Sequence, residues 1–324
     1  MNKAPLVIFR KQLGDVLLLE PALAKLAAYS GGPVMLASRP AFNPLLQLME
    51  NVVPAPRTPL RRAAMVISFD PTPKACLWAL TTLGALTTPA LGKRLIVTRP
   101  KYLRPWHHYI FPAGCTTLDE SHNYRAEYFF NAMPCPATTS FRPPRLQMPP
   151  ANWLTVNLPE KFILLHPTSA WQRKSWPVNS WAQTLAKLHA LGVGPFVVTG
   201  GNAPWEAEYV AALEQASGIP LINLCGKTSL TAYLAVVSKA SLVLCVDGSA
   251  THLAAAFQRP AVTLFGPTLP LHWHFPSPIA TLLDARNYSN ELKPAVANIP
   301  VEPVLEAVVK AASFNLDNPL GRSW

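Results

Sequence analysis

Residues 241 to 268, SLVLCVDGSATHLAAAFQRPAVTLFGPT, place an acid, a glycine, hydroxyl groups and a histidine between a strand-like run and a helix-like run. Backbone amides at a helix start lack an intrahelical partner and carry a partial positive charge, so the amides of Gly248 and Ser249 suit a phosphate. Asp247 and His252 lie beside them. Ligands of parallel α/β sheets bind beyond the carboxyl ends of the strands, so this stretch predicts a phosphate site. The alternative is structural, with Asp247 only capping the helix.

A second cationic loop is HPTSAWQRKSWPVNSW, residues 166 to 181, which follows the strand-like run KFILL. If KFILL belongs to the same sheet, Arg173 and Lys174 lie at the same carboxyl edge and reach the same anion. Trp176, followed by Pro177, is expected to anchor the start of the next helix. The alternative interpretation is a solvated basic loop with a core tryptophan.

The first half of the chain carries an acid in a comparable position. In KQLGDVLL, Asp15 follows the strand-like run PLVIF and opens a predicted helix. A helix N-terminus favours the ionised carboxylate, so Asp15 is available as a proton acceptor. Equally, Asp15 simply caps its helix.

Strand-like and helix-like runs alternate along both halves. In the first half we predict strands at PLVIF, PVMLAS, AAMVISF and RLIVT, and one helix over GDVLLLEPALAKLAAY with Pro21 near its first turn. The second half repeats the alternation after a proline-rich linker at residues 133–159. This pattern predicts an α/β protein with two Rossmann-like domains and a cleft between them. We expect domains at 1–150 and 151–300, followed by a closing helix and tail at 301–324.

Several function classes lack their signatures. The chain has no GxxxxGK[ST] and no GxGxxG after a strand, which argues against a P-loop NTPase and a dinucleotide-binding dehydrogenase. HWH at 272–274 has no further ligand nearby in sequence, and we predict neither a metal site nor a cofactor. The excess of 28 Lys and Arg over 17 Asp and Glu favours anionic partners. Because these cations are dispersed, we expect no nucleic acid among them.

The sequence also suggests a location. Five scattered cysteines without a CxxC pair indicate free thiols, and the apolar start is too short for a signal peptide. The longest uncharged run falls short of a membrane span. We therefore expect a cytoplasmic protein. The stretch TRPKYLRPWHHYIFP, residues 98–112, mixes cations with aromatics and suits an anionic acceptor or the membrane surface, with an ordinary solvated loop as the alternative.

Three stretches together resemble glycosyltransferase family 9, the heptosyltransferases of lipopolysaccharide core synthesis. They are LGDVLLLEPALAKL, HPTSAWQRKSWPVNSWAQ and GKTSLTAYLAVVSKASLVLCVDGSATHLAAAFQRPAVTLFGPTLPLHW. The resemblance implies a GT-B fold, with the two parallel sheets facing a central cleft. It also implies inverting, metal-independent transfer of heptose from ADP-heptose to a sugar hydroxyl of the anionic lipopolysaccharide inner core. The C-terminal domain would bind the donor, and the N-terminal domain the acceptor, at the cytoplasmic face of the inner membrane.

The resemblance also implies roles for individual residues. The family's D-[ST]-G order is exchanged here at Gly248-Ser249, and the usual basic residue before GD is replaced by Gln12-Leu13. The implied roles are Asp15 as general base, Lys174 on the donor diphosphate, Glu206 near the nucleotide ribose (with Glu208 two residues on), and Asp247, Gly248, Ser249 and His252 in the donor loop. For acceptor binding we expect Lys11, the cation left upstream of GD, and Arg104 of the 98–112 stretch.

Two other functions fit the same sequence features. A nucleotide-sugar 2-epimerase of the same fold would isomerise its nucleotide sugar without any acceptor. A non-catalytic nucleotide-binding relative would bind ADP and release none from ADP-heptose, even with an acceptor present.

Overall fold

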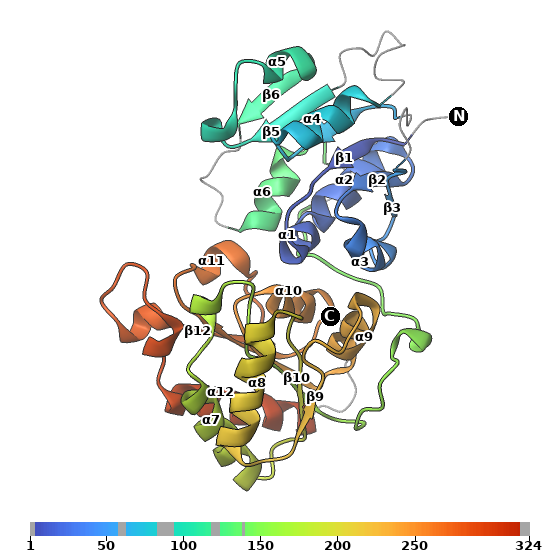
Figure 1. The fold of residues 1–324 in the computed structure, drawn as a ribbon. Helices are drawn as coiled ribbons and strands as arrows, with labels where there is room; N and C mark the ends of the chain where they lie inside the picture. The colour runs from blue at the N-terminus through green and yellow to red at the C-terminus, as the bar shows by residue number, and fades with distance from the viewer. Residues whose placement is uncertain (1–3, 58–62, 83–93, 118–123, 138–139, 318–324) are drawn as a thin grey trace. The chain divides into compact units, whose positions relative to one another are not determined.

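The computed structural model describes residues 4–57, 63–82, 94–117, 124–137 and 140–317. The chain divides into two compact units, Met1–Gln147 (unit 1) and Met148–Trp324 (unit 2). Each unit is a twisted sheet with helices packed on it (Figure 1). The division falls within the proline-rich stretch predicted as the linker.

Unit 1 contains a six-stranded parallel sheet in the order β3-β2-β1-β4-β5-β6. The four predicted strands are present, and the short edge strands β3 and β6 are additional. The strands are β1 (Leu6–Ile8), β2 (Val34–Ala37), β3 (Val52–Pro54), β4 (Val66–Ser68), β5 (Arg94–Thr98) and β6 (Gly114–Thr117). The helices are α1 (Leu13–Leu18), α2 (Glu20–Ser30), α3 (Asn43–Gln47), α4 (Pro73–Leu80), α5 (His107–Ile110) and α6 (Arg125–Ala132).

The single helix predicted over residues 14–29 is wrong, because the segment forms two helices, α1 and α2, that meet at Leu19. Pro21 has no N–H to donate back to Leu17, and its ring crowds the preceding turn, so the first helix ends and a second begins. Pro21 then occupies the first turn of α2, where no such donor is needed.

Unit 2 repeats the same architecture, with the order β12-β11-β10-β7-β8-β9 and all pairs parallel. The edge strand β12 was not predicted. The strands are β7 (Ile163–His166), β8 (Phe196–Val198), β9 (Leu221–Asn223), β10 (Leu242–Val246), β11 (Ala261–Phe265) and β12 (Ala280–Asp284). The helices are α7 (Val178–Ala190), α8 (Pro204–Ser217), α9 (Leu230–Lys239), α10 (Ser249–Ala256), α11 (Pro270–Trp273) and α12 (Val301–Asp317).

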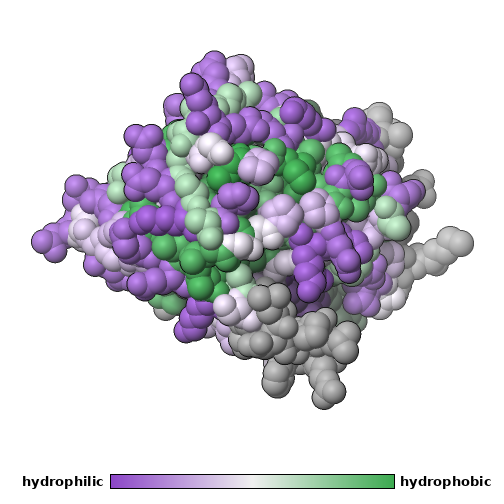
Figure 2. All heavy atoms as spheres, turned by 90° about the horizontal axis from the view of Figure 1, so that it is seen from below, coloured by the Kyte–Doolittle hydropathy of each residue, from purple (hydrophilic) through white to green (hydrophobic). Residues whose placement is uncertain are grey.

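The predicted closing helix is α12, which packs against α7 and the strands β10, β11 and β12 within unit 2. Among the described helices, none combines the length and the apolar character needed to cross a membrane. On the face shown in Figure 2, hydrophilic side chains border and interrupt the hydrophobic ones. None of the five cysteines forms a disulfide.

Both sheets reverse their strand order at one point, between β1 and β4 in unit 1 and between β7 and β10 in unit 2. Crossover helices on either side of such a point run on opposite faces of the sheet, which leaves a crevice at the carboxyl ends of the strands where ligands bind. The loops after β1, β4, β7 and β10 are therefore the positions at which a site is expected.

Candidate functional site

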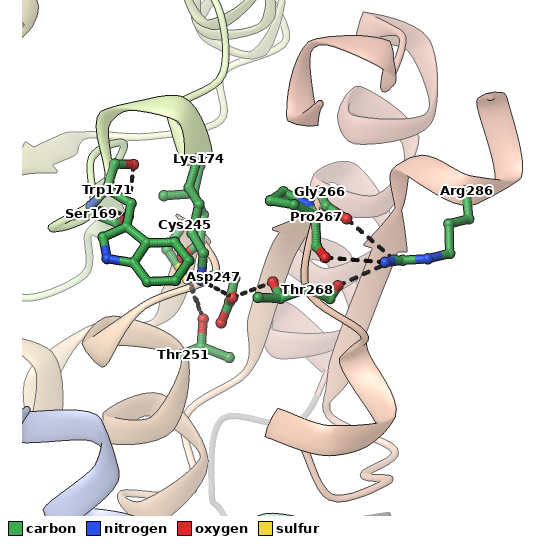
Figure 3. Close-up of polar contacts among 11 residues, drawn as sticks. Ser169, Trp171, Lys174, Cys245, Asp247, Thr251, Gly266, Pro267, Thr268 and Arg286 are labelled. Carbon is green, nitrogen blue, oxygen red and sulfur yellow. Dashed lines mark hydrogen bonds and ion pairs between the residues drawn. The ribbon is translucent and has the colours of Figure 1, made fainter. Parts of the chain in front are cut away.

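An ion pair bridges the point of strand reversal in unit 2. Lys174 follows β7, and Asp247 comes directly after β10. Nζ of Lys174 donates a hydrogen bond to Asp247 Oδ2 at 2.6 Å (Figure 3). The two side chains are only 14% and 5% exposed. The ammonium group has three N–H donors, so this bond leaves two for a ligand. The ion pair therefore brings together the loops after β7 and β10, which were predicted to lie at one edge of the sheet.

The start of α10 lies next to this ion pair in the chain. The helix begins at Ser249, with Gly248 as its N-cap in an extended conformation. No side chain caps the helix, and Asp247 is bonded elsewhere, so the interpretation of Asp247 as a mere cap is wrong. Gly248 and Ser249 are half-buried. The first amides of an eight-residue helix thus remain as hydrogen-bond donors beside a lysine, an arrangement suited to an anion.

A second hydrogen bond, donated by Thr268, also holds the carboxylate of Asp247. Thr268 Oγ1 donates to Asp247 Oδ2 at 2.5 Å. The loop that carries Thr268 is bonded in turn by Arg286, whose guanidinium donates to the carbonyl oxygens of Gly266, Pro267 and Thr268 at 3.2–3.3 Å (Figure 3). Arg286 also pairs with Asp284 at 2.9 Å. Arg286 was not predicted from the sequence, since its partners are mainly backbone carbonyls that no residue type indicates.

Two tryptophans position the loop that carries Lys174. Trp171 is 54% exposed, and Nζ of Lys174 and the guanidinium of Arg173 each lie 5.0 Å from the centre of its rings. Trp176 is fully buried, donates its indole N–H to the carbonyl of Ile299 at 3.0 Å and packs edge-on against Trp181. The prediction that Trp176 anchors the next helix agrees with these contacts.

His252 is buried in the first turns of α10. Burial lowers its pKa to about 4, although the carboxylate of Asp247 acts in the opposite direction. The imidazole is therefore uncharged at pH 7. His274 is also buried, and its Nδ1 bonds the carbonyl of Phe275 at 2.6 Å. Desolvation lowers the pKa of His274 as well.

Glu206 lies near the start of α8, close to the carboxyl ends of β7 and β8. Its Oε1 accepts hydrogen bonds from Thr168 Oγ1 at 2.6 Å and from the amide of Gly201 at 3.0 Å. A side chain at Gly201 would collide with this carboxylate, because an added Cβ would lie 2.3 Å from Glu206 Oε2. Glu206 is buried whereas Glu208 is exposed, so Glu206 is the acid built into this edge of the sheet.

In unit 1, Asp15 is half-buried in the first turn of α1, and its Oδ2 accepts from the amide of Gln12 at 3.2 Å. Asp15 therefore contributes to capping its helix, as one of the two interpretations expects. Lys11 and Arg104 are exposed, Lys11 between β1 and α1 and Arg104 just before α5. The backbone amide of Arg104 donates to His107 Nδ1 at 2.9 Å.

The histidines of the HWH stretch lie on and just after α11. Within the described residues, no three His, Cys, Asp or Glu side chains gather as a metal ion would require.

Comparisons with known proteins agree on one family. Residues 126–296, more than half of the chain, match the model of glycosyltransferase family 9 (heptosyltransferase). Lipopolysaccharide heptosyltransferase 1 of Escherichia coli K12 is 33% identical over 124 residues, which are 37% of this chain and 37% of that protein. The match thus spans little more than a third of the relative's length.

Solved structures resemble the chain over nearly its whole length. A glycosyltransferase family 9 protein from Veillonella parvula gives a TM-score of 0.77 at 18% identity, over 96% of this chain and 97% of that one. The Escherichia coli ADP-heptose lipopolysaccharide heptosyltransferase II gives 0.74 at 20% identity, over 97% and 99%. These likenesses concern the fold, and they confirm the predicted class of two Rossmann-like units of the GT-B type.

Proposed function

Because the chain belongs to glycosyltransferase family 9, the heptosyltransferase family, we propose that it transfers heptose from ADP-heptose to a sugar hydroxyl of the lipopolysaccharide inner core, with inversion at the anomeric carbon. The observation that carries the proposal is the Lys174–Asp247 pair beside the start of α10, at the point of strand reversal in unit 2.

In this proposal the donor diphosphate binds at α10. The acceptor oxygen forms a bond to the anomeric carbon while the bond from that carbon to the phosphate oxygen breaks, and ADP departs with the bonding electrons. The negative charge that grows on the departing phosphate is stabilised by the remaining N–H groups of Lys174 and by the amides of Ser249 and its neighbours. Because these groups supply the positive charge, we propose a reaction independent of a divalent metal.

The remaining groups of unit 2 orient the donor. Asp247 Oδ2 is bonded to Lys174 and Thr268, and a carboxylate oxygen accepts more than one hydrogen bond, so Asp247 is suited to receive heptose hydroxyls. Glu206 would accept from the ribose hydroxyls, since its position is fixed by Thr168 and Gly201. His252, uncharged at pH 7, adds a neutral hydrogen-bonding group.

Asp15 of unit 1 is proposed as the general base that takes the proton of the acceptor hydroxyl. A general base contributes roughly 10²–10⁴-fold to such a step. A carboxylate suffices when it acts late, because the hydroxyl becomes acidic as its oxygen bonds to the oxocarbenium-like carbon.

The acceptor is proposed to be presented at the cytoplasmic face of the inner membrane. The segment around α5 exposes three aromatic rings and two cations, a combination suited to an anionic lipid interface. They are Tyr102, Trp106, Tyr109, Lys101 and Arg104.

A donor screen tests the proposal. The protein is incubated with ADP-heptose, ADP-glucose or UDP-glucose, with and without a heptose-free lipopolysaccharide core, and nucleotide release and product mass are measured. We expect ADP release only with ADP-heptose plus acceptor, an unchanged rate in EDTA, and α-linked product from β-linked donor. Isomerisation without acceptor would instead indicate an epimerase, and ADP binding without any turnover a non-catalytic relative.

A further inference from the structure

A buried hydroxyl beside the start of α10 has no role in the proposed function. Tyr233 lies near the start of α9 and is only 8% exposed. Its phenol oxygen is shielded from solvent and has no hydrogen-bond partner in the described part of the chain. Nearly all buried hydroxyl groups in proteins are hydrogen-bonded, because leaving one unpaired costs free energy, so this unpaired oxygen requires an explanation.

The ring of Tyr233 is held in a defined place at the carboxyl edge of the sheet. Ser229 caps α9 by accepting a hydrogen bond from the amide of Ala232 at 3.2 Å, which fixes the turn that carries Tyr233. The centre of the Tyr233 ring lies 5.5 Å from that of His166, the last residue of β7. His166 is held in turn through its Nδ1, which is 3.0 Å from Thr199 Oγ1. The phenol is therefore anchored among buried groups near the ends of the strands.

Ser249, the first residue of α10, lies next to this phenol. The helices α9 and α10 pack against each other within unit 2. Burial raises the pKa of Tyr233, and the adjacent side chain of Ser249 acts in the opposite direction. The two oxygens nevertheless do not meet the geometry of a hydrogen bond. Because Ser249 is half-buried and the phenol oxygen is shielded from solvent, a ligand at the start of α10 reaches Ser249 and not Tyr233.

The order of residues at the start of α10 gives Ser249 a use for such a neighbour. A serine or threonine at the N-cap of a helix is oriented by the helix itself, because its oxygen accepts a hydrogen bond from an N–H of the first turn. In this chain the N-cap is Gly248, and no side chain caps the helix. Ser249 occupies the first helical position instead, so its hydroxyl lacks the orientation that an N-cap receives.

We propose that Tyr233 is a positioning residue for the donor diphosphate and acts through Ser249. The phenol O–H donates to Ser249 Oγ, and Ser249 directs its own O–H to a phosphate oxygen, since a hydroxyl group accepts and donates at the same time. Each hydroxyl keeps its proton. The identity of the ligand as a nucleotide donor rests on the proposed function, whereas the relay of two hydrogen bonds requires only a phosphate group at α10.

Calorimetric titration of the full chain with ADP tests the proposal. Tyr233→Phe removes only the phenol oxygen and is expected to weaken ADP binding about fivefold, since Ser249 loses the hydrogen bond that orients it. The thermal midpoint is expected to stay the same or rise slightly, because the removed oxygen has no hydrogen bond to lose. Tyr128→Phe removes a phenol oxygen from a buried tyrosine of unit 1 and serves as the matched control, with ADP binding unchanged.

A double-mutant cycle tests whether Tyr233 acts through Ser249. Ser249→Ala is expected to weaken ADP binding about tenfold, because the hydroxyl that contacts the phosphate is gone. Tyr233→Phe added to Ser249→Ala should weaken binding no further, since the group that the phenol orients is already missing. Additive losses would show that the phenol acts independently of Ser249 and would overturn the relay.

An exchange of two neighbouring residues provides a rescue. The variant Gly248→Ser, Ser249→Gly moves the hydroxyl to the N-cap, where the amides of α10 orient it. A side chain fits there, because an added Cβ at Gly248 would lie 3.6 Å from Cβ of Ser169, an ordinary contact. ADP binding of the exchange variant is expected within about threefold of the unaltered protein, and Tyr233→Phe should no longer weaken it. An equal loss in both backgrounds would contradict the proposal.

The remaining outcomes separate this proposal from the proposed function. If Tyr233→Phe weakens ADP binding while no acceptor supports ADP release from ADP-heptose, the relay stands and the transferase proposal fails. If transfer proceeds and Tyr233→Phe binds ADP as tightly as the unaltered protein, the relay fails and the transferase proposal stands. A lower thermal midpoint in Tyr233→Phe would show that the phenol serves the fold, and a complete lack of ADP binding by the unaltered protein would overturn both proposals.

Discussion

The two units share one strand order, but the cation beside the crevice has different surroundings in each. In unit 2, Lys174 is paired at 2.6 Å with a buried carboxylate, which Thr268 also contacts. In unit 1, Arg10 lies over the ring of Trp78, and both line a cavity of about 260 Å³. The same topology therefore provides two crevices. The one in unit 2 contains a buried ion pair, and the one in unit 1 is lined by cations with no carboxylate among its described lining residues.

This difference assigns different tasks to the two crevices. A lysine held by a buried acid is pre-oriented, so little entropy is lost when a diphosphate binds to its remaining donors. Uncompensated cations in an exposed cavity attract an acidic ligand and tolerate variation in its position. Under the proposed function, the comparison favours donor orientation in unit 2 and acceptor recognition in unit 1, and variants can test each assignment separately.

The largest effect is expected from Asp15→Ala. Loss of the proposed base should reduce kcat by about 10²–10⁴-fold. The affinity for ADP, which the proposal assigns to unit 2, should stay within about twofold. Steady-state ADP release and calorimetric ADP titration give the two quantities.

Asp15→Asn serves as the isosteric control, because the amide oxygen still accepts the hydrogen bond from Gln12 that Asp15 receives. Its stability should match that of the unaltered protein while its kcat stays low. Full turnover in either variant would show that the base lies elsewhere.

Lys174→Met breaks the ion pair of unit 2 and leaves Asp247 buried without its cation. Removal of one partner of a buried pair costs about 3 kcal/mol or more. We expect a drop of that size in the free energy of unfolding, measured with urea, together with at least tenfold weaker ADP binding. Lys187→Met breaks the exposed pair with Glu302 and should change neither quantity appreciably.

The double variant Lys174→Met, Asp247→Leu separates stability from binding. Replacement of both charges by apolar side chains should recover most of the stability, although the hydroxyl of Thr268 loses its acceptor. ADP binding should not recover, because the cation is still missing. Recovery of both would mean that Lys174 serves only the fold.

The sequence predicts the central strands of both sheets, whereas three of the four edge strands, β3, β6 and β12, are missed. The central strands β7 and β10 are buried on both faces, and their sequences form nearly continuous apolar stretches. The edge strand β3 has three residues and ends in Pro54, and β12 is only half-buried, so neither carries that signal. The break at Leu19 was also missed, because hydrophobic spacing continues across it while the hydrogen bonding does not.

The same limit applies to the candidate sites. Lys174 and Asp247 could be brought together from sequence because each follows a strand of one parallel sheet, and that rule needs no side-chain detail. The cavity of unit 1 depends on Arg57 and Lys74 flanking one space, which follows from how α4 packs against β4 and β1. Charge spacing along the chain contains no such information.

A pH titration of stability tests the burial of the histidine at the end of β7 in unit 2. Burial lowers the pKa of His166 to about 4, and its Nδ1 bonds Thr199 at 3.0 Å. Between pH 4 and 6.5 the unfolded chain binds a proton that the folded His166 does not, so stability falls as pH falls through this window. The loss for this one group approaches about 3 kcal/mol by pH 4. Urea unfolding at pH 7.5 and 5 should show a smaller difference for His166→Gln, and an unchanged difference would contradict the burial argument.

The smallest effect concerns the guanidinium that bonds the 266–268 loop. Arg286→Lys keeps the charge but cannot reach three carbonyl oxygens and Asp284 together, so about 1–2 kcal/mol of stability should be lost. Because Thr268 and hence Asp247 are held through this loop, ADP binding should weaken a few-fold, with kcat little changed. In Arg286→Ala, low-millimolar guanidinium should restore ADP binding in part, whereas sodium chloride at equal concentration should not. Equal effects of the two salts would mean that the loop keeps Thr268, and through it Asp247, in place without Arg286.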